Sequence, residues 1–146
     1  MRYDNTISLI SKIRETSSTF IISELEKLGI KGIVPSHGEI IVTLIKHREL
    51  TMTEIAEKIN RDRSTVTTLV KKLNKIGFTA TKKNESDHRS NFVFLTSKGK
   101  ELEEGFNQIS KRLYEVQFKG IKEEEKEIFR NVLIKIYDNF KQENQN

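Results

Sequence analysis

The stretch that decides the fold class is ELTMTEIAEKINRDRSTVTTLVKKLNKIGF, residues 49–78. Its first part carries Thr51 and Glu54 at the spacing of a capping box, in which the threonine hydroxyl and the glutamate satisfy backbone N–H groups at the start of a helix. This box predicts a short helix over about residues 52–59, and residues 60–61 then make a turn.

A second helix follows this turn. Asp62 or its neighbour can cap the helix, and Gly77 can end it. Between these positions, apolar residues recur at intervals of three and four, which is the period of a helix with one buried face: Val66, Leu69, Val70, Leu73 and Ile76. Two short helices joined by a tight turn predict a helix-turn-helix.

The face of the second helix opposite its apolar stripe is polar and basic. At about 100° per residue, this face and its flanks carry hydroxyl and ammonium groups and no carboxylate: Ser64, Thr67, Thr68, Lys71, Lys72 and Lys75. Such groups suit base edges and phosphates, and an acid-free face avoids repulsion from the sugar-phosphate backbone. An ordinary solvated face is the alternative, but it usually mixes both signs, so we favour a DNA recognition helix.

A β-hairpin is predicted directly after the second helix. FTATKK and NFVFL, residues 78–83 and 91–95, are rich in β-branched or aromatic residues. The stretch NESDHRS between them is polar throughout, as expected of a long hairpin tip. A hairpin that directly follows a helix-turn-helix is a wing.

Basic residues lie on both strands beside the tip of this wing. Lys82 and Lys83 approach the tip, and Arg89 leaves it, so the strands would hold a guanidinium where it can enter a minor groove beside the recognition helix. Asp87 could pair with a basic side chain and restrict the arginine, or it could simply be a turn-forming aspartate. Together with Thr65 of the recognition helix, these residues complete the candidate DNA-binding set.

Further helices are expected on both sides of this unit. Apolar spacing predicts helices over about residues 5–28 and Pro35–His47, a long helix that Thr96 caps and Gly120 ends, and a final helix from about Lys122. The final helix has a broad apolar face: Ile128, Phe129, Val132, Leu133, Ile136, Tyr137 and Phe140. Because a chain of 146 residues has little else to cover this face, the first, fifth and last predicted helices look like a dimerisation layer. Packing within one chain is the alternative.

Positive charge is concentrated in the middle of the chain. Residues 61–98 hold nine Lys and Arg against three Asp and Glu, whereas the rest of the chain sums to −1 of the net charge of +5. A basic surface confined to one segment is typical of a protein that binds a polyanion, although a solvated basic face is a common alternative.

Length and composition narrow the class further. The length of 146 residues indicates one domain, and 35% hydrophobic against 32% charged residues suggests either a shape with a high surface-to-volume ratio or a core completed by a partner chain. The absence of cysteine excludes disulfides and thiolate metal sites. No apolar stretch approaches the roughly 20 residues that span a bilayer, and the start MRYDNTISL lacks a signal-peptide core, so we expect a soluble, cytoplasmic protein.

These elements resemble a known family. The helix pair, then Asp87-x-Arg89, then Leu95-Thr96-x-x-Gly99, is similar to the winged helix-turn-helix signature of the MarR (multiple antibiotic resistance regulator) family. The likeness covers nearly the whole chain. It implies a mainly α fold with a small β wing, in a single MarR-like domain over residues 1–146. About 35–98 would be the DNA-binding part, and about 1–30 and 99–146 the dimerisation helices.

The resemblance also implies a function. A homodimer with intertwined terminal helices and two wings would bind a double-stranded, pseudo-palindromic DNA operator and usually repress transcription. The second helix of the helix-turn-helix would lie in the major groove, Arg89 would be the minor-groove arginine, and Asp87 its acidic partner. Many members release DNA when a small aromatic or phenolic effector binds, but no residue of this chain points to such an effector.

Other classes of function find little support in the sequence. The histidines His37, His47 and His88 are isolated and read as surface or cap residues rather than metal ligands, and no catalytic or cofactor motif is present. We therefore expect no metal, no cofactor and no enzymatic activity. The remaining alternative is a dimeric protein-interaction adaptor that keeps the fold without binding DNA, and the basic middle segment argues against it.

Overall fold

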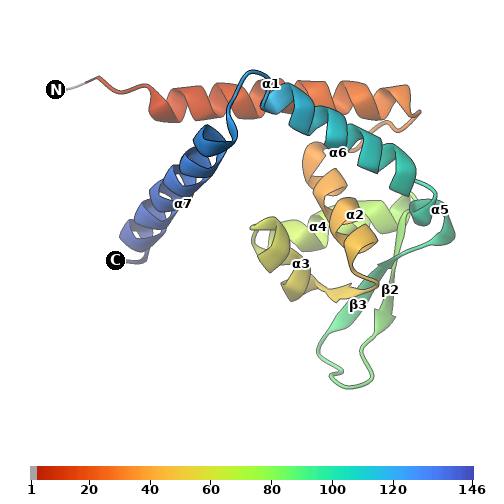
Figure 1. The fold of residues 1–146 in the computed structure, drawn as a ribbon. Coiled ribbons are helices and arrows are strands. Elements are labelled where there is room, and N and C mark those ends of the chain that lie inside the picture. Colours follow the sequence, from red (N-terminus) through yellow and green to blue (C-terminus); the bar gives the residue numbers. More distant parts are fainter. Residues whose placement is uncertain (1–2) are drawn as a thin grey trace. The chain divides into compact units, whose positions relative to one another are not determined.

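The computed structural model describes residues 3–146, which form seven helices and three strands (Figure 1). In chain order these are α1 (Thr6–Lys27), α2 (Pro35–Lys46), β1 (Leu50–Thr51), α3 (Met52–Ile59), α4 (Arg63–Lys75), β2 (Thr79–Lys83), β3 (Asn91–Leu95), α5 (Ser97–Lys100), α6 (Glu103–Gln117) and α7 (Glu123–Gln145). The prediction of a mainly helical fold with a small β wing and long terminal helices is confirmed.

The chain divides into two compact units. The first ends at Ser110, and the second runs from Lys111 to Asn146, so α6 begins in one unit and ends in the other. Within residues 3–146, no helix is both long enough and apolar enough to cross a membrane.

The helix-turn-helix forms where the sequence predicts it. Thr51 Oγ1 accepts the backbone N–H of Glu54 at 3.2 Å and thereby caps α3. Asn60 takes the left-handed conformation in the turn, with φ 57° and ψ 48°, which asparagine adopts more readily than most residues. Asp62 then caps α4 by accepting the backbone N–H of Thr65 at 2.8 Å.

A histidine holds the start of α2. His37 Nδ1 accepts the backbone N–H of Val34 at 2.9 Å, the role that a glutamate or glutamine plays in a capping box. The ring is only 5% exposed, and this burial, with the nearby charge of Lys72, lowers the pKa of His37. The interpretation of His37 as a cap residue agrees with this contact.

The three strands form one antiparallel sheet in the order β1-β3-β2. β2 and β3 pair over five residues as the predicted hairpin, which projects from the first unit (Figure 1). β1 pairs with the other edge of β3 and places Leu50 opposite Val93, both buried. The sequence analysis missed β1, because a strand of two residues cannot show an alternating pattern.

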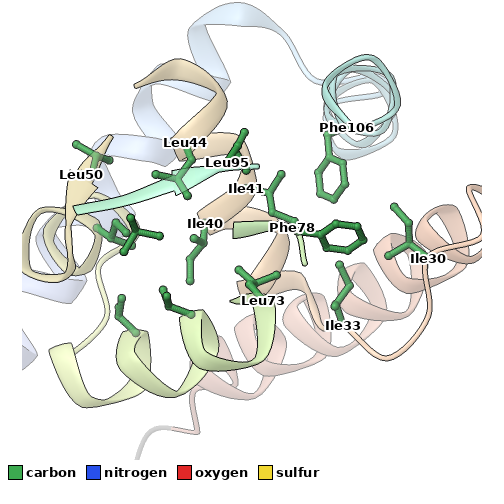
Figure 2. Close-up of a cluster of buried hydrophobic side chains, with 14 of the residues drawn as sticks. Ile30, Ile33, Ile40, Ile41, Leu44, Leu50, Leu73, Phe78, Leu95 and Phe106 are labelled. Atoms are coloured by element: carbon green, nitrogen blue, oxygen red, sulfur yellow. The ribbon is translucent and has the colours of Figure 1, made fainter. Parts of the chain in front are cut away.

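One hydrophobic core fills the first unit. Its best-buried side chains come from α1, α2, α3, α4 and β3: Leu25, Ile40, Ile41, Ile55, Val66, Val70, Leu73 and Val93. Figure 2 shows Phe106 reaching from α6 toward Phe78, which stands just before β2. The predicted apolar stripe of α4 is therefore its core face, and the opposite face is left for solvent.

The long helix predicted from Thr96 is wrong in one respect, because the structure breaks it. Thr96 caps only the four residues of α5; the backbone N–H of Leu102 then bonds to the carbonyl of Gly99 at 3.1 Å, and α6 starts afresh at Glu103. α6 ends at Gln117, and Gly120, with φ 75°, lies in the turn beyond it. Apolar spacing continues across the break, so periodicity alone does not reveal it.

In the second unit, a lysine ties α7 to the end of α6. Lys126 Nζ lies 4.9 Å from the ring centre of Tyr114 and 5.0 Å from that of Phe118, and it pairs with Glu123 at 2.6 Å. α7 starts without a Ser or Thr cap; instead, Glu125 accepts the backbone N–H of Lys122 at 3.0 Å. Three glutamates in this first turn suit the positive end of the helix dipole.

Candidate nucleic-acid interface

The candidate residues of α4 all lie on the solvent side of the helix. All seven are exposed: Ser64, Thr65, Thr67, Thr68, Lys71, Lys72 and Lys75. The opposite face of α4 is buried in the core through Val66, Val70 and Leu73, each fully inaccessible to solvent. The helix itself contains no acidic residue, so an uninterrupted polar and basic surface runs along it.

The hydroxyl groups on this surface already donate hydrogen bonds to acceptors in α4 and its N-cap. Ser64 and Thr65 donate to the Asp62 carboxylate at 2.6 and 2.9 Å, Thr67 donates to the carbonyl of Arg63 at 2.9 Å, and Thr68 donates to the carbonyl of Ser64 at 3.2 Å. Their oxygen lone pairs remain available. In this arrangement the hydroxyl oxygens offer acceptors, the threonines also offer methyl groups, and the lysines offer donors.

Asp62 is the carboxylate nearest to this surface in sequence. Hydrogen bonds from the Ser64 side chain, and from the backbone and side chain of Thr65, lower the pKa of Asp62 to about 2. The carboxylate is thus ionised at neutral pH, but its oxygens are occupied by the N-terminus of α4. Its role is to cap the helix.

The three lysines of α4 differ in their surroundings. Lys71 and Lys75 are exposed on the polar face. Lys72 instead lies close to the segment between α1 and α2, since a Cβ atom added to Gly32 would be 3.9 Å from its Nζ, and its charge also acts on His37. Lys71 and Lys75 are therefore better placed for DNA than Lys72.

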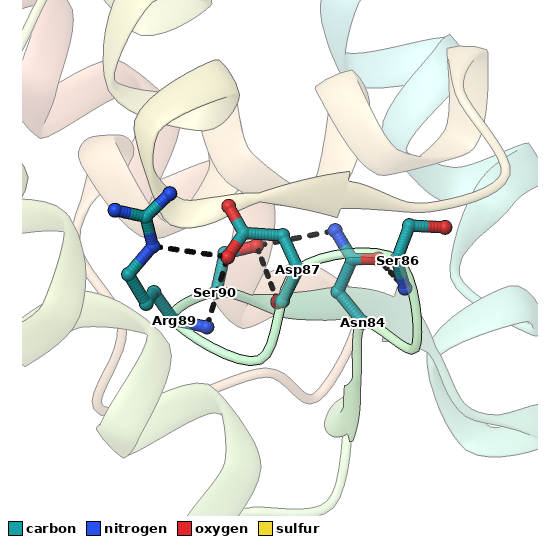
Figure 3. A network of polar contacts seen from close by, with 5 residues as sticks. All are labelled: Asn84, Ser86, Asp87, Arg89 and Ser90. Atoms are coloured by element: carbon teal, nitrogen blue, oxygen red, sulfur yellow. Dashed lines mark hydrogen bonds and ion pairs between the residues drawn. The ribbon is translucent and has the colours of Figure 1, made fainter.

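The tip of the wing is closed by a local hydrogen-bond network (Figure 3). Asn84 donates from Nδ2 to Ser90 Oγ at 3.1 Å and accepts the backbone N–H of Ser86 at 3.0 Å. The backbone N–H of Asp87 bonds to the carbonyl of Asn84 at 3.2 Å, and that of Ser90 to the carbonyl of Asp87 at 3.1 Å. The tip is thus a set of turns and not an open loop.

Arg89 projects from this tip. Its side chain is 92% exposed, and its Nε lies 3.3 Å from Asp87 Oδ1, which also accepts the backbone N–H of Arg89 at 3.0 Å. Asp87 is about half exposed and therefore orients the base of the arginine while its terminal nitrogens stay in solvent. Asp87 therefore pairs with a basic side chain, which is one of the two roles that the sequence analysis considered for it; the other was that of a turn-forming aspartate.

The two lysines of the wing are also not equivalent. Lys82 pairs with Glu49, just before β1, at 2.5 Å, and its Nζ lies 5.6 Å from the ring centre of Phe94. Lys83, at the end of β2, is exposed. Lys82 consequently anchors the strand, and Lys83 offers a cation beside the tip.

Two arginines near the helix-turn-helix were missed by the sequence analysis. Arg63 is the first residue of α4 and is exposed beside the candidate face. Arg61 lies in the turn, and its Nη2 donates to Ser36 Oγ, at the start of α2, over 3.5 Å. Arginine side chains and helix N-termini are both common phosphate-binding groups, so the position of these arginines at the start of the predicted recognition helix was the available signal.

No metal site accompanies this surface: residues 3–146 contain no group of three or more His, Cys, Asp or Glu side chains that could hold an ion. The arrangement is instead a polar helix face and an arginine-tipped hairpin, both exposed on the unit that holds the hydrophobic core. A family model for MarR matches residues 33–90, which include α2, the helix-turn-helix and the wing as far as Ser90. The helix-turn-helix and the wing are thus of the MarR type.

Individual relatives agree with this assignment. An uncharacterized HTH-type transcriptional regulator, YdgJ of Bacillus subtilis, is 26% identical over 117 residues, which are 77% of this chain and 71% of YdgJ. The chain is a MarR-type DNA-binding transcriptional regulator, and this class of regulator is not enzymatic, in agreement with the prediction.

Solved structures show the same fold. The Staphylococcus aureus MepR–DNA complex superposes with a TM-score of 0.82 at 23% identity, over 94% of this chain and 99% of MepR. Bordetella bronchiseptica BpsR, a protein whose DNA binding is regulated by 6-hydroxynicotinic acid, superposes with a TM-score of 0.80 at 15% identity, over 94% of this chain and 98% of BpsR.

The L-T-x-x-G element, residues 95–99, has a structural explanation. Thr96 Oγ1 donates to the carbonyl of Gly77 at 2.5 Å and accepts the backbone N–H of Gly99 at 3.1 Å, so one hydroxyl joins the end of the α4 segment to the start of α5. A Cβ on Gly99 would collide with the carbonyl oxygen of Phe78. Only glycine fits there, because a backbone segment passes too close for any side chain.

Proposed function

We propose that the protein is a homodimeric, sequence-specific repressor that binds a pseudo-palindromic operator. One observation carries the proposal: an exposed, acid-free helix face and a 92% exposed arginine project from the same unit, beside each other in the chain. Hydroxyl and ammonium groups suit base edges and phosphates, and an arginine on a narrow hairpin suits a minor groove. A regulator of this kind acts in the cytoplasm, where its operator is.

In the proposed complex, α4 lies in the major groove. The exposed hydroxyls of Ser64, Thr67 and Thr68 accept hydrogen bonds from base amino groups, because their protons are engaged within the helix. Lys71 and Lys75 contact phosphates or guanine edges, and Lys83 contacts the backbone beside the wing. Arg89 enters the adjacent minor groove with Asp87 fixing its direction, while Lys72 and Lys82 have mainly structural contacts.

Exposed apolar faces support the homodimer. α1 exposes Ile7, Leu9 and Ile13, each more than half accessible, and the second unit exposes another set: Tyr114, Val116, Ile128, Phe129, Val132, Ile134, Tyr137 and Phe140. The second unit also has a hollow of about 660 Å³, lined in part by Tyr114, Phe118 and Phe129. A second copy that covers these faces would give a homodimer with two recognition helices, one for each half-site of the operator.

Regulation by a small aromatic or phenolic effector is supported by a relative only. DNA binding by BpsR is regulated by 6-hydroxynicotinic acid, and BpsR shares the fold of this chain. We propose that this regulator also releases its operator on binding a small aromatic molecule. A screen of phenolic and carboxylic compounds for release of labelled operator tests this part separately.

Selection of bound sequences from a random duplex pool tests the main proposal. We expect an enriched inverted repeat, protected over two half-sites in a footprint, with weaker binding when Lys71 and Lys75 are both replaced by alanine. Enrichment of no sequence, by a protein that stays folded, would contradict sequence-specific binding. Binding of the intact dimer to proteins but not to DNA would favour the adaptor instead.

A further inference from the structure

Asn74 lies in the last turn of α4, half-buried, where the recognition helix meets the wing. Its side-chain amide spans two residues of β2. Thr79 Oγ1 donates to Asn74 Oδ1 at 2.6 Å, and Asn74 Nδ2 donates to Thr81 Oγ1 at 3.0 Å. Thr79 and Thr81 are two positions apart on a strand and so point to the same face. Both halves of one amide are thus used to join the helix to the strand.

The two bonds have different consequences. The hydroxyl of Thr79 is buried, at 2% exposure, and Asn74 satisfies it. Thr81 is exposed and could bond to water equally well, so its bond to Asn74 is not needed to satisfy a buried group. The second bond instead restricts orientation, because a planar amide that is bonded at both its oxygen and its nitrogen limits how far β2 can rotate relative to α4.

Rotation at this point is amplified along the wing. β2 extends five residues from Thr79 to Lys83, or about 17 Å at the usual rise per residue. A rotation of about 10° at its base would move the tip by about 3 Å over that length. A displacement of this size is large enough to decide whether Arg89, at the wing tip, reaches the minor groove.

We propose that Asn74 is a positioning residue, which sets the angle between the recognition helix and the wing so that Arg89 meets the minor groove while α4 occupies the major groove. This inference rests on the proposed function, since it presumes that both elements contact one DNA duplex. The rival explanation is that pairing of β2 with β3, and of β3 with β1, already fixes the wing.

The first test measures the wing without DNA. The chain has no cysteine, so spin labels can be placed cleanly by Lys58→Cys on α3 and His88→Cys at the wing tip, with labelled protein diluted into unlabelled protein. Asn74→Ala and Thr81→Val should each broaden the distance distribution between the labels. Thr81→Val is the decisive variant, because it removes one exposed bond and keeps a β-branched side chain. Thr43→Val, whose hydroxyl bonds only within α2, is the matched control. Equal distributions in all variants would overturn the proposal.

The second test measures coupling on DNA. Thr81→Val should weaken operator binding between about twofold and tenfold, the worth of one hydrogen bond. In addition, Arg89→Ala should cost less affinity in the Thr81→Val background than in the unmodified protein, because a misplaced arginine already contributes less to operator binding. Equal fold losses in both backgrounds would overturn the proposal. Failure of the unmodified protein to bind any operator would instead contradict the proposed function, and the spin-label distances would still decide the role of Asn74.

Discussion

Arg89 and Asp87 form the smallest unit for which we propose a role in DNA binding. The arginine is almost fully exposed, while the aspartate accepts its backbone N–H at 3.0 Å and its Nε at 3.3 Å. An exposed ion pair of this kind adds little to folding stability. We therefore expect the Asp87–Arg89 pair to contribute to DNA binding rather than to folding stability.

Replacing Arg89 by alanine should weaken operator binding roughly tenfold to a hundredfold, because a groove-reading arginine is lost. The free energy of unfolding should change by less than about 0.5 kcal/mol, as for other exposed positions. His88→Ala, the exposed neighbour, is the control and should bind nearly normally. Fluorescence anisotropy and urea unfolding measure the two quantities. Equal affinity of the Arg89 variant and the parent would remove the wing tip from the interface.

Gly99→Ala should destabilise the first unit by roughly 3 kcal/mol, the upper part of the range for overpacking, because the new Cβ would meet the backbone carbonyl of Phe78. Gly105→Ala is the matched control. Its Cβ would meet only the end of the exposed Leu28 side chain, at 2.7 Å, which can turn away. Urea unfolding of both variants measures the difference, and equal stabilities would show that the close approach at Gly99 is relieved at no cost.

At the scale of elements, the sequence predicts well those helices and strands whose limits have a local chemical signal. Thr51 and Asp62 cap α3 and α4 as expected, and the hairpin follows its β-branched and aromatic residues. β1 and the break between α5 and α6 could not be predicted. Both depend on contacts distant in sequence: Leu50 pairs with Val93, and Gly99 docks against Phe78.

The same distinction applies to the candidate site. Periodicity separates the exposed face of α4 from its buried face, so the set of exposed residues was predictable. The contacts of Lys72 with the α1–α2 segment and of Lys82 with Glu49 were not, because a long side chain can turn toward groups that only the tertiary fold brings near. Asn74 was missed because its partners, Thr79 and Thr81, lie on a strand whose placement against α4 the sequence does not show.

The start of α2 should make stability depend on pH. The pKa of His37 is lowered in the folded protein, so between that pKa and the ordinary value near 6.5 the unfolded chain binds the extra proton. Stability should therefore fall as pH decreases below about 6.5 and go on falling through the folded pKa. Urea unfolding at a series of pH values from 7.5 to about 5 measures this loss.

His37→Gln provides the matched control for that pH series. A glutamine at this position of a capping box can still accept the backbone N–H of Val34, but it does not titrate. The variant should lose less stability than the parent on acidification. Parallel curves for the two proteins would show that His37 does not account for the acid sensitivity.

At the scale of the whole molecule, the exposed apolar side chains of α1 and α7 are the feature that a single copy leaves unexplained. Val132→Asp and Ile128→Asp, both on α7, should each shift the proposed homodimer to a monomer, because the new charge would have to be buried in the interface. Asn131→Asp, at an exposed polar position away from the apolar face of α7, is the control. Analytical ultracentrifugation measures the mass, and an unchanged dimer in both apolar variants would place the dimer interface elsewhere.

The central claim is that the polar face of α4 and the wing form one cationic surface for duplex DNA. It is tested most directly by measuring the dissociation constant for a duplex operator, or for random duplex DNA, across a salt series. We predict that affinity falls on the order of a thousandfold between about 50 and 200 mM salt, as phosphate contacts release counterions. Affinity that hardly changes with salt, or no binding even at the lowest salt, would contradict the account.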